Sequence, residues 1–192
     1  LDLYIGIYKR CQKKWLKMFK EYNNILNKTE KNYLKSTIID SNNFPFYLNE
    51  TEIGKIKNNY FPFLSHIILH RSEDQKENRI NSSLYEYTIN LFKKISKKYK
   101  FKYKEIYRIA LNLTFNNGKK KSITHTDHLY PHKQLLIYLH NDDLNSCTCI
   151  LIKNKIKKII PTPNKGVIWD NFKHYQLIPK KGYRLVLVYT FI

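Results

Sequence analysis

The feature that most constrains the fold is a succession of short β-type runs in the second half of the chain. Turn clusters such as Asn116-Asn117-Gly118 and Pro161-Thr162-Pro163-Asn164 separate these runs. The expected strands are residues 106–115, 122–127, 134–139, 148–152, 157–160, 166–169 and 183–191. Many short strands at regular spacing are typical of a sandwich or barrel of antiparallel sheets. We therefore predict a mainly β fold built on a cupin-like jelly roll, that is, a double-stranded β-helix.

The first half of the chain carries two helical patterns. Residues 8–26 place apolar side chains at helical spacing with lysines between them. Residues 84–99 show the same spacing behind Ser83 and Glu86, which fit a capping box. These patterns predict N-terminal helices, the second of which packs across a sheet.

Between the two helical patterns the signals are mixed. Residues 27–31 are polar and interrupt the first helix, and residues 33–39 fit either a short helix or a strand. Residues 44–47 are aromatic and contain a proline that favours extended backbone, and residues 60–64 form a second aromatic, strand-like run. The charged residues 71–79 predict a surface loop.

The length of 192 residues favours one domain with a substantial core. We expect helical support over about residues 1–100 and the jelly-roll core over about residues 103–192. A hydrophobic content of 42% excludes a disordered chain. No apolar run approaches the ~20 residues that span a bilayer, so we expect no membrane partner, and the oligomeric state stays open.

The formal net charge of +20 has two readings. Such a charge attracts nucleic acid or another polyanion. However, nearly all of it comes from lysine, in a chain that is also rich in Asn, Ile and Tyr, which is the amino-acid signature of an AT-rich genome. Arginine, the residue best suited to base and phosphate forks, occurs only at positions 10, 71, 79, 108 and 184.

The three cysteines do not make a disulfide framework, which indicates a reducing, cytoplasmic compartment. The short apolar start of the chain lacks a small-residue cleavage site, so we expect no signal peptide. Cys147 and Cys149 are expected on the same face of a strand. Packing as small hydrophobic residues is favoured over a metal site, because a second thiolate pair is missing.

The most suggestive polar motif is His125-Thr126-Asp127. In an extended strand, residues i and i+2 point to the same face, so an imidazole nitrogen and a carboxylate oxygen converge. One further histidine would complete a 2-His-1-carboxylate facial triad, which holds Fe(II) and leaves coordination positions open. Alone, the pair is weak, because the chain has 7 His and 15 acidic residues.

The best third ligand is His174, which we expect on a short turn after the buried run that ends at Trp169. Ten residues further on, Arg184 enters an otherwise apolar strand. A charge in that position is costly unless it is paired, and a dicarboxylate would pair it through a bidentate fork. Taken alone, His174 would be interpreted as an ordinary loop histidine, and Arg184 as a partner in a structural salt bridge or an exposed strand residue. Together with the His-x-Asp pair, the two residues indicate a metal site more specifically.

With these residues in order, the sequence resembles the 2-oxoglutarate- and Fe(II)-dependent oxygenases, in particular their prolyl-4-hydroxylase-like branch. The matching pieces are His125-Thr126-Asp127, Leu136–Asn141, Thr148, Gly166–Asp170, His174 and Arg184. Phage and viral members are more similar still, through Phe44-Pro45-Phe46-Tyr47 and Arg108–Leu113. The resemblance covers roughly residues 36–192.

The chain departs from the family pattern in two places. The family's Gly-Gly-Thr turn reads Asn145-Ser146-Cys147-Thr148, and His140 shifts the family's Asn by one position. Neither departure touches a metal ligand.

The resemblance implies that His125, Asp127 and His174 hold Fe(II) and that Arg184 binds 2-oxoglutarate. Cofactor-binding roles for Tyr138, Asn112 and Thr148 follow from it as well. Asp170 and Asn112 are candidates to orient the second nitrogens of the metal-binding histidines. The alternatives are that Tyr138 serves core packing and that Asn112 is a polar residue at a sheet edge. The co-substrates would be 2-oxoglutarate and O2, with ascorbate as a further candidate.

The implied reaction is hydroxylation of a protein or peptide side chain, with release of succinate and CO2. An oxygenase acting on nucleic-acid bases and a non-catalytic jelly-roll binding module remain alternatives. A viral origin would place the protein in the host cytoplasm. His128, His132 and His140 lie near the motif; we favour loop or surface positions for them over ligand or substrate-facing roles.

Overall fold

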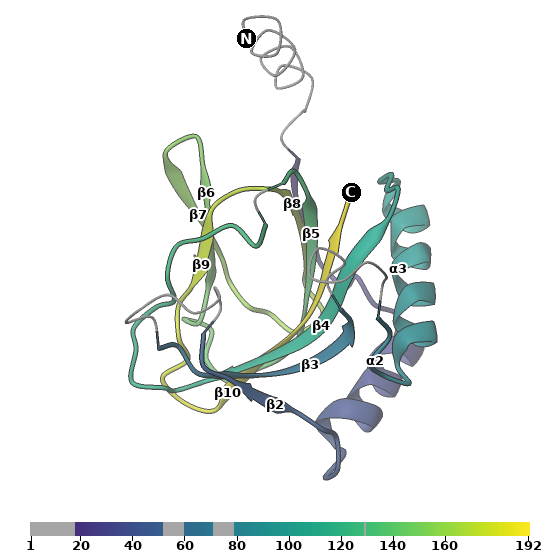
Figure 1. Cartoon of the computed structure of the whole chain (residues 1–192), viewed down its shortest axis with the longest axis horizontal. Helices are drawn as coiled ribbons and strands as arrows, with labels where there is room; N and C mark the ends of the chain where they lie inside the picture. The colour runs from purple at the N-terminus through teal and green to yellow at the C-terminus, as the bar shows by residue number, and fades with distance from the viewer. Residues whose placement is uncertain (1–17, 52–59, 71–78, 129) are drawn as a thin grey trace, which may run out of the picture.

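Two antiparallel sheets face each other in this computed structural model, which describes residues 18–51, 60–70, 79–128 and 130–192 (Figure 1). In these residues the larger sheet has the strand order β1-β8-β5-β10-β4-β3-β2. Its strands are β1 (Phe19–Tyr22), β2 (Tyr47–Asn49), β3 (Phe63–Leu69), β4 (Ile106–Phe115), β5 (Lys133–Asn141), β8 (Gly166–Asp170) and β10 (Tyr183–Phe191). The smaller sheet has the order β7-β6-β9, with β6 (Thr148–Ile152), β7 (Lys155–Ile159) and β9 (His174–Gln176).

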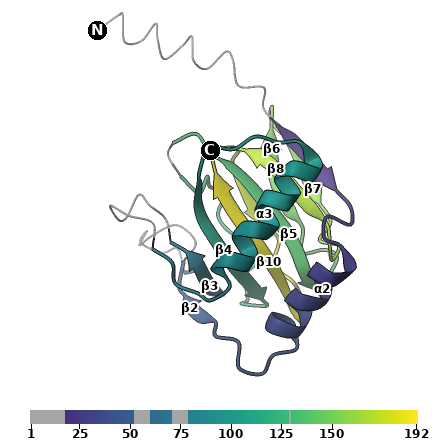
Figure 2. The same cartoon turned by 90° about the vertical axis from the view of Figure 1, so that its right-hand side faces the viewer.

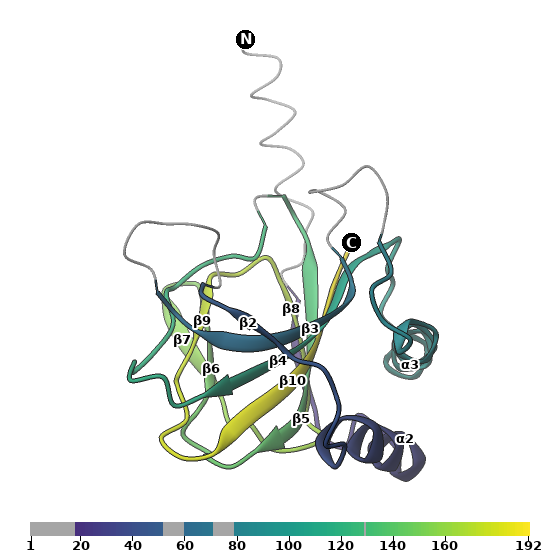
Figure 3. The same ribbon diagram turned by 60° about the horizontal axis from the view of Figure 1, so that its bottom comes forward.

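Helices cover the outer face of the larger sheet. They are α2 (Lys28–Leu34), which continues as a π-helical segment over Lys35–Ile39, and α3 (Tyr85–Tyr99). Figures 2 and 3 show α3 crossing this face, with α2 beside it and the smaller sheet on the opposite side. The predicted mainly β fold with N-terminal helices is confirmed.

The side chains of β10 alternate between the two faces of the larger sheet. Leu185, Leu187 and Tyr189 belong to the core under the helices, where the Tyr189 hydroxyl donates to the Thr88 carbonyl at 3.0 Å. Val186 and Val188 belong to a second core that lies between the two sheets. Because successive side chains of a strand point to opposite faces, one sequence serves both cores.

The segment that joins β1 to α2 is held by Asn164, in the turn before β8. Its Oδ1 accepts from the Leu26 N–H at 2.8 Å and its Nδ2 donates to the Leu26 carbonyl at 3.0 Å. Its backbone carbonyl accepts from the Ile25 N–H at 3.0 Å. Asn164 has φ +67°, a left-handed conformation that Asn tolerates better than most residues. One buried amide thus ties the N-terminal segment to the core.

The helix expected over residues 8–26 is wrong where the structure describes it, because Phe19–Tyr22 is strand β1. Residues 8–17 of that prediction lie outside the described residues. Phe19 pairs with Trp169 and Tyr22 with Gly166, so pairing with β8 overrides the local helical spacing. The polar break expected at 27–31 is also wrong. Asn27 is the N-cap of α2 and forms a reciprocal capping box with Glu30.

The helix expected over residues 84–99 is confirmed as α3, but its capping box does not form. Leu84 is the N-cap and makes no side-chain cap hydrogen bond, while the Ser82 hydroxyl accepts from the Leu84 N–H at 3.2 Å. Residues 33–39, left open between helix and strand, are helical. Of the loop expected at 71–79, residues 71–78 lie outside the described residues.

Six of the seven expected strands of the second half are present as β4, β5, β6, β7, β8 and β10. The expected strand 122–127 is instead irregular, with one isolated bridge at His125 and another just before it at Lys121. The turn expected at His174 is strand β9. Strands β1, β2 and β3 come from the part of the chain expected to be helical support. No described helix is long and apolar enough to cross a membrane.

Replacement of Asn164 by Ala is expected to destabilise the fold by about 3 kcal/mol, because two hydrogen bonds to buried Leu26 backbone groups are lost, at about 1–3 kcal/mol for each polar group left unsatisfied. Asn154→Ala is the matched control. Asn154 also has positive φ, at +62°, but is exposed, so that only left-handed strain of about 1 kcal/mol is added. Urea unfolding measures the free energy of unfolding of both variants. Equal losses of stability would contradict a stabilising role for the hydrogen bonds between Asn164 and Leu26.

Candidate metal centre

His125 and His174 face each other across a reciprocal pair of backbone hydrogen bonds. The His125 N–H donates to the His174 carbonyl at 2.9 Å, and the His174 N–H donates to the His125 carbonyl at 2.8 Å. Directly opposed residues in such an antiparallel pair project their side chains to the same face. The two imidazole rings accordingly lie with their centroids 4.7 Å apart. Two residues 49 positions apart in the chain are thereby brought to one point.

Each histidine also has a fixed ring orientation. The Nδ1 of His125 lies 2.9 Å from the Ile123 carbonyl, and the Nδ1 of His174 lies 3.2 Å from the Phe172 carbonyl. A carbonyl only accepts, so these contacts assign the Nδ1 proton of both rings as the donor. The Nε2 atoms are directed at Asp127. In rings that carry a proton on both nitrogens, Nε2 donates to the carboxylate, and after loss of that proton the Nε2 lone pair can bind a metal.

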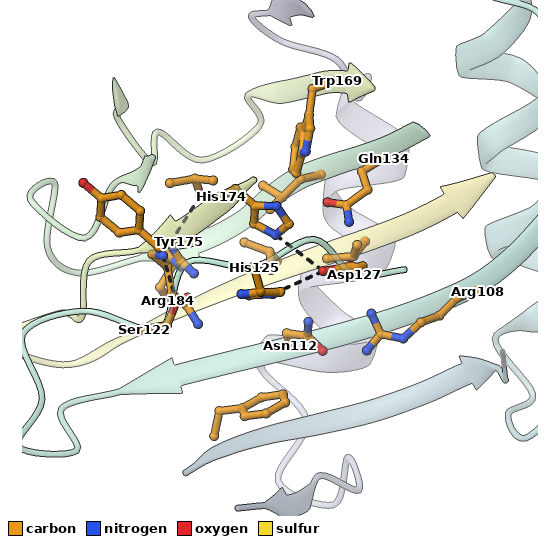
Figure 4. A pocket seen from close by; sticks show the side chains of 16 residues that line it. Arg108, Asn112, Ser122, His125, Asp127, Gln134, Trp169, His174, Tyr175 and Arg184 are labelled. Carbon is orange, nitrogen blue, oxygen red and sulfur yellow. Dashed lines mark hydrogen bonds and ion pairs between the residues drawn. The ribbon is translucent and has the colours of Figure 1, made fainter. Parts of the chain in front are cut away.

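Asp127 completes the cluster. Its Oδ1 lies 3.3 Å from the His125 Nε2 and 3.5 Å from the His174 Nε2 (Figure 4). Burial alone would raise the pKa of the Asp127 carboxyl, but the hydrogen bonds and charges of the two histidines outweigh it and hold that pKa well below its usual range. The carboxylate is therefore ionised, as a metal ligand must be.

Among the described residues, His125, Asp127 and His174 are the group that could hold a metal ion. Their ligand atoms all lie within 4.8 Å of one another. Two imidazole nitrogens and one carboxylate oxygen form a facial triad, which suits Fe(II). The triad lines a cavity of ≈ 80 Å³ between the two sheets.

Arg184, Thr148 and Tyr138, each expected to bind a co-substrate, come together in the same cavity region. The Arg184 Nη1 donates to the Ser146 carbonyl at 2.9 Å and lies 3.5 Å from the Thr148 hydroxyl. The Tyr138 hydroxyl donates to the Thr148 hydroxyl at 2.6 Å. Arg184 is 3% exposed and therefore a buried cation.

The pKa of Tyr138 is raised to about 12, because burial outweighs the opposing effects of Arg184 and Thr148. The phenol therefore stays protonated at neutral pH and can donate a hydrogen bond.

The loop that replaces a Gly-Gly-Thr turn is well organised. Asp143 accepts from the N–H groups of Asn145 and Lys180, and the Ser146 hydroxyl bonds to Asn141 and to the Asp143 carbonyl. This loop places the Ser146 carbonyl against Arg184.

The orienting role expected of Asp170 or Asn112 belongs instead to the carbonyls of Ile123 and Phe172. A backbone carbonyl two residues before each histidine reaches Nδ1 without any side-chain partner. Asp170 accepts the Met18 N–H and ties the start of β1 to β8. Asn112 does line the cavity, on the β4 wall below Asp127 in Figure 4.

The neighbouring histidines differ from one another. His128 and His132 lie in the loop before β5, as expected, but are buried beside Tyr130, so a surface position is wrong for them. The ring centroids are 4.8 Å apart for both His128–Tyr130 and His128–His132. His140 is part-exposed and lies 3.1 Å from Asp142. None of the three is among the described residues that line the cavity.

Sequence reasoning missed several polar residues of the cavity wall, among them Arg108, Gln134 and Trp169. The alternation of side chains along each strand could have predicted Arg108 and Gln134 as cavity residues. Arg108 and Gln134 occupy positions of β4 and β5 whose sheet neighbours on the same face line the cavity. Cys147 and Cys149 are free and buried, and neither belongs to the metal-binding group found among the described residues.

No family model and no curated protein matches the chain. Solved structures do match it. A Burkholderia pseudomallei oxidoreductase described as a 2OG-Fe(II) oxygenase family member superimposes with a TM-score of 0.71 at 11% identity, over 97% of this chain and 89% of the other.

Two further matches are prolyl hydroxylases. One, from Trichoplax adhaerens in complex with a hypoxia inducible factor peptide fragment, has a TM-score of 0.63 at 12% identity, over 91% of this chain and 83% of the other. The other is the viral collagen prolyl hydroxylase of Paramecium Bursaria Chlorella virus-1 in a 2OG complex, with a TM-score of 0.58 at 12% identity, over 90% of this chain and 94% of the other.

The chain has the fold of the 2-oxoglutarate/Fe(II) oxygenases. This confirms the predicted double-stranded β-helix and the resemblance read from the motifs. At identities this low, the shared property is the fold, and the chemistry depends on the residues of the site.

Replacement of Asp127 by Ala is expected to abolish tight metal binding, because the charged ligand of the triad is lost. The loss of Mn(II) affinity, measured anaerobically by calorimetry, should exceed the roughly 10–100-fold that changes in outer-shell partners cost. His140→Ala is the matched control, since it removes a nearby imidazole that pairs with Asp142 and leaves the triad intact. If His140→Ala weakens binding as much as Asp127→Ala does, the metal is not held by the triad.

Proposed function

We propose that this chain is an Fe(II)- and 2-oxoglutarate-dependent oxygenase that hydroxylates a side chain of a protein or peptide. One observation carries the proposal: a His-Asp-His cluster and a buried arginine share one cavity. His125, Asp127 and His174 supply the cluster and Arg184 the cation.

The residues of the cluster fit Fe(II). Both histidines use Nδ1 for a backbone carbonyl and direct Nε2 inward, and the carboxylate of Asp127 is ionised. Three ligands from one face leave room on the metal for a chelating co-substrate and O2. His125, Asp127 and His174 would hold the iron.

The inner end of the cavity fits a carboxylate of 2-oxoglutarate. Arg184 carries a planar fork of donors that matches a carboxylate, and Tyr138 and Thr148 add hydroxyl groups beside it. The elevated pKa of Tyr138, about 12, keeps its proton available for donation. Arg184, Tyr138 and Thr148 would therefore bind the end of 2-oxoglutarate that is remote from the metal.

When bound, iron with 2-oxoglutarate and O2 supplies an oxidative decarboxylation in which one oxygen atom enters succinate, the other enters the hydroxylated product, and CO2 is released. The chain itself binds, orients and shields. The apolar side chains of Leu136, Val186 and Val188 line the cavity and limit the access of water to the reacting groups. His125 and His174, clamped to each other, keep the ligand atoms in place.

A protein or peptide substrate is supported by two of the structural neighbours. The Trichoplax prolyl hydroxylase is described with a peptide fragment bound, and the viral enzyme is described as a collagen prolyl hydroxylase. The cavity is open to the outside, so a side chain could enter while the rest of a peptide stays on the surface.

Purified protein with Fe(II), 2-oxoglutarate and O2 is expected to form succinate, even without a second substrate at a slower, uncoupled rate. Arg184→Met should raise the KM for 2-oxoglutarate by about 10- to 100-fold, since a hydrogen-bonded charge pair contributes ~1.5–3 kcal/mol. Arg184→Lys should recover part of this loss through its charge.

Arg79→Met is the matched control, because Arg79 is exposed and lies outside the metal cavity. It removes the same charge and should leave the KM unchanged. Mass spectrometry of succinate formed from labelled 2-oxoglutarate gives the readout. A wild-type protein that binds Fe(II) but forms no succinate would contradict the proposed function.

A further inference from the structure

We propose that the chain carries a second catalytic site, a serine–histidine dyad that hydrolyses a carboxylic ester. The nucleophile is Ser82 and the base is His66, whose Nε2 lies 2.7 Å from the Ser82 hydroxyl oxygen. A hydroxyl within hydrogen-bond reach of an imidazole that a third group orients is the arrangement of an activated serine nucleophile. The proposed oxygenase reaction uses neither residue.

Hydrogen bonds fix the roles of the two ring nitrogens of His66. Its Nδ1 lies 2.9 Å from the Pro45 carbonyl, which can only accept, so Nδ1 carries the proton. The Nε2 atom of the neutral ring is then an acceptor, and the Ser82 hydroxyl donates to it. Burial lowers the pKa of His66 and outweighs the opposing effect of the hydrogen bond to Pro45. The imidazole is therefore neutral at pH 7 and able to accept the Ser82 proton.

Both members of the dyad are held by regular structure. His66 belongs to β3 and is 7% exposed. Ser82 lies between β3 and α3. The preceding residue, Asn81, donates its N–H to the Ile68 carbonyl of β3 at 3.0 Å. The Ser82 carbonyl accepts from the N–H of Tyr85, the first residue of α3, at 3.1 Å. Backbone hydrogen bonds on both sides of Ser82 thus set its distance from the base.

The dyad lines a groove of ≈ 710 Å³ at the β2 edge of the larger sheet, a volume that accepts a small organic ligand. In Figure 1, β2 and β3 lie at the bottom of the view, away from β6 and β7 of the smaller sheet. Among the described residues, none lines both this groove and the metal cavity. The groove is therefore a separate site.

The surroundings of Ser82 favour the negative charge that develops when a serine attacks an ester carbonyl. The Leu84 N–H donates to the Ser82 Oγ at 3.2 Å, at the N-terminal end of α3, where the helix dipole stabilises anions. Asn81 and Arg79 line the same groove, and their side chains offer further donors. Arg79 is the one formally charged residue among the described residues of the groove. The groove therefore suits a neutral or anionic ester.

The reaction balances with water as the only co-reactant. The Ser82 oxygen attacks the carbonyl carbon of the ester while the hydroxyl proton passes to the His66 Nε2. The bond between that carbon and the alcohol oxygen breaks, the alcohol leaves with the proton, and the acyl group remains on Ser82. Water, deprotonated by the same imidazole, then releases the carboxylic acid and restores the Ser82 hydroxyl.

The test uses the full chain in the presence of EDTA, which removes hydrolysis by metal-bound water. Hydrolysis of p-nitrophenyl butyrate measures turnover. A biotinylated fluorophosphonate measures the activated serine, because the serine oxygen displaces fluoride and forms a stable phosphonyl ester. Peptide mass spectrometry locates the label. We expect the label on Ser82, and we expect turnover to fall in proportion to labelling.

Ser82→Ala should abolish the labelling and the turnover that the label inhibits. Ser83→Ala is the matched control, because Ser83 is the next residue, is exposed and lines the same groove. It should leave both measurements unchanged. His66→Gln keeps a hydrogen-bond acceptor near Ser82 but removes the base, and should slow labelling about 100- to 10,000-fold, the contribution of a general base.

A wild-type protein that is neither labelled nor active on the ester overturns the inference. The hydrogen bond between His66 and Ser82 would then only stabilise the junction of β3 and α3. A label on a residue other than Ser82, or equal labelling of wild type and Ser82→Ala, also overturns it. If circular dichroism shows that Ser82→Ala does not fold, the mapped label and the rate of His66→Gln decide. None of these outcomes affects the proposed oxygenase function, which is measured by succinate.

Discussion

The site depends on the reciprocal hydrogen bonds between the backbones of His125 and His174. This bridge joins an irregular segment before β5 to the first residue of β9, and no regular strand is required on the His125 side. It sets the distance between the two imidazoles, while the Ile123 and Phe172 carbonyls set their rotation. Asp127 then needs only to follow His125 by two residues to direct its carboxylate between them. Backbone geometry alone thus preorganises the three ligand atoms.

The central strand β10 connects this site to the fold. Its odd-numbered residues, such as Leu187 and Tyr189, pack under α3, and its even-numbered residues face the cavity. The helices therefore stabilise the same strand that carries Arg184, Val186 and Val188 into the cavity. A shift of one residue in register would move Arg184 into the core under the helices. The packing of the helix-covered face therefore determines which side chains of β10 face the cavity.

Strand alternation indicated the jelly roll, and the order of the motifs indicated that His125, Asp127 and His174 belong together. The strand expected at 122–127, from which their convergence was argued, is irregular. Predictions from the sequence were wrong where strand pairing or backbone hydrogen bonds determine the structure. Phe19–Tyr22 has helical spacing but pairs with β8. The partners of the histidine Nδ1 atoms are backbone carbonyls, which every residue has and which the sequence therefore cannot reveal. His128 stacks on Tyr130 and His132 meets the same ring edge-on, a clustering that spacing in the sequence does not reveal.

The most direct test of the account is an experimental structure of the protein with Mn(II) and 2-oxoglutarate. The account predicts metal contacts from the Nε2 atoms of His125 and His174 and from the Asp127 carboxylate, with the remote carboxylate of 2-oxoglutarate on Arg184 beside Tyr138. A metal held elsewhere, or a 2-oxoglutarate carboxylate bound by Arg108 instead of Arg184, would contradict it.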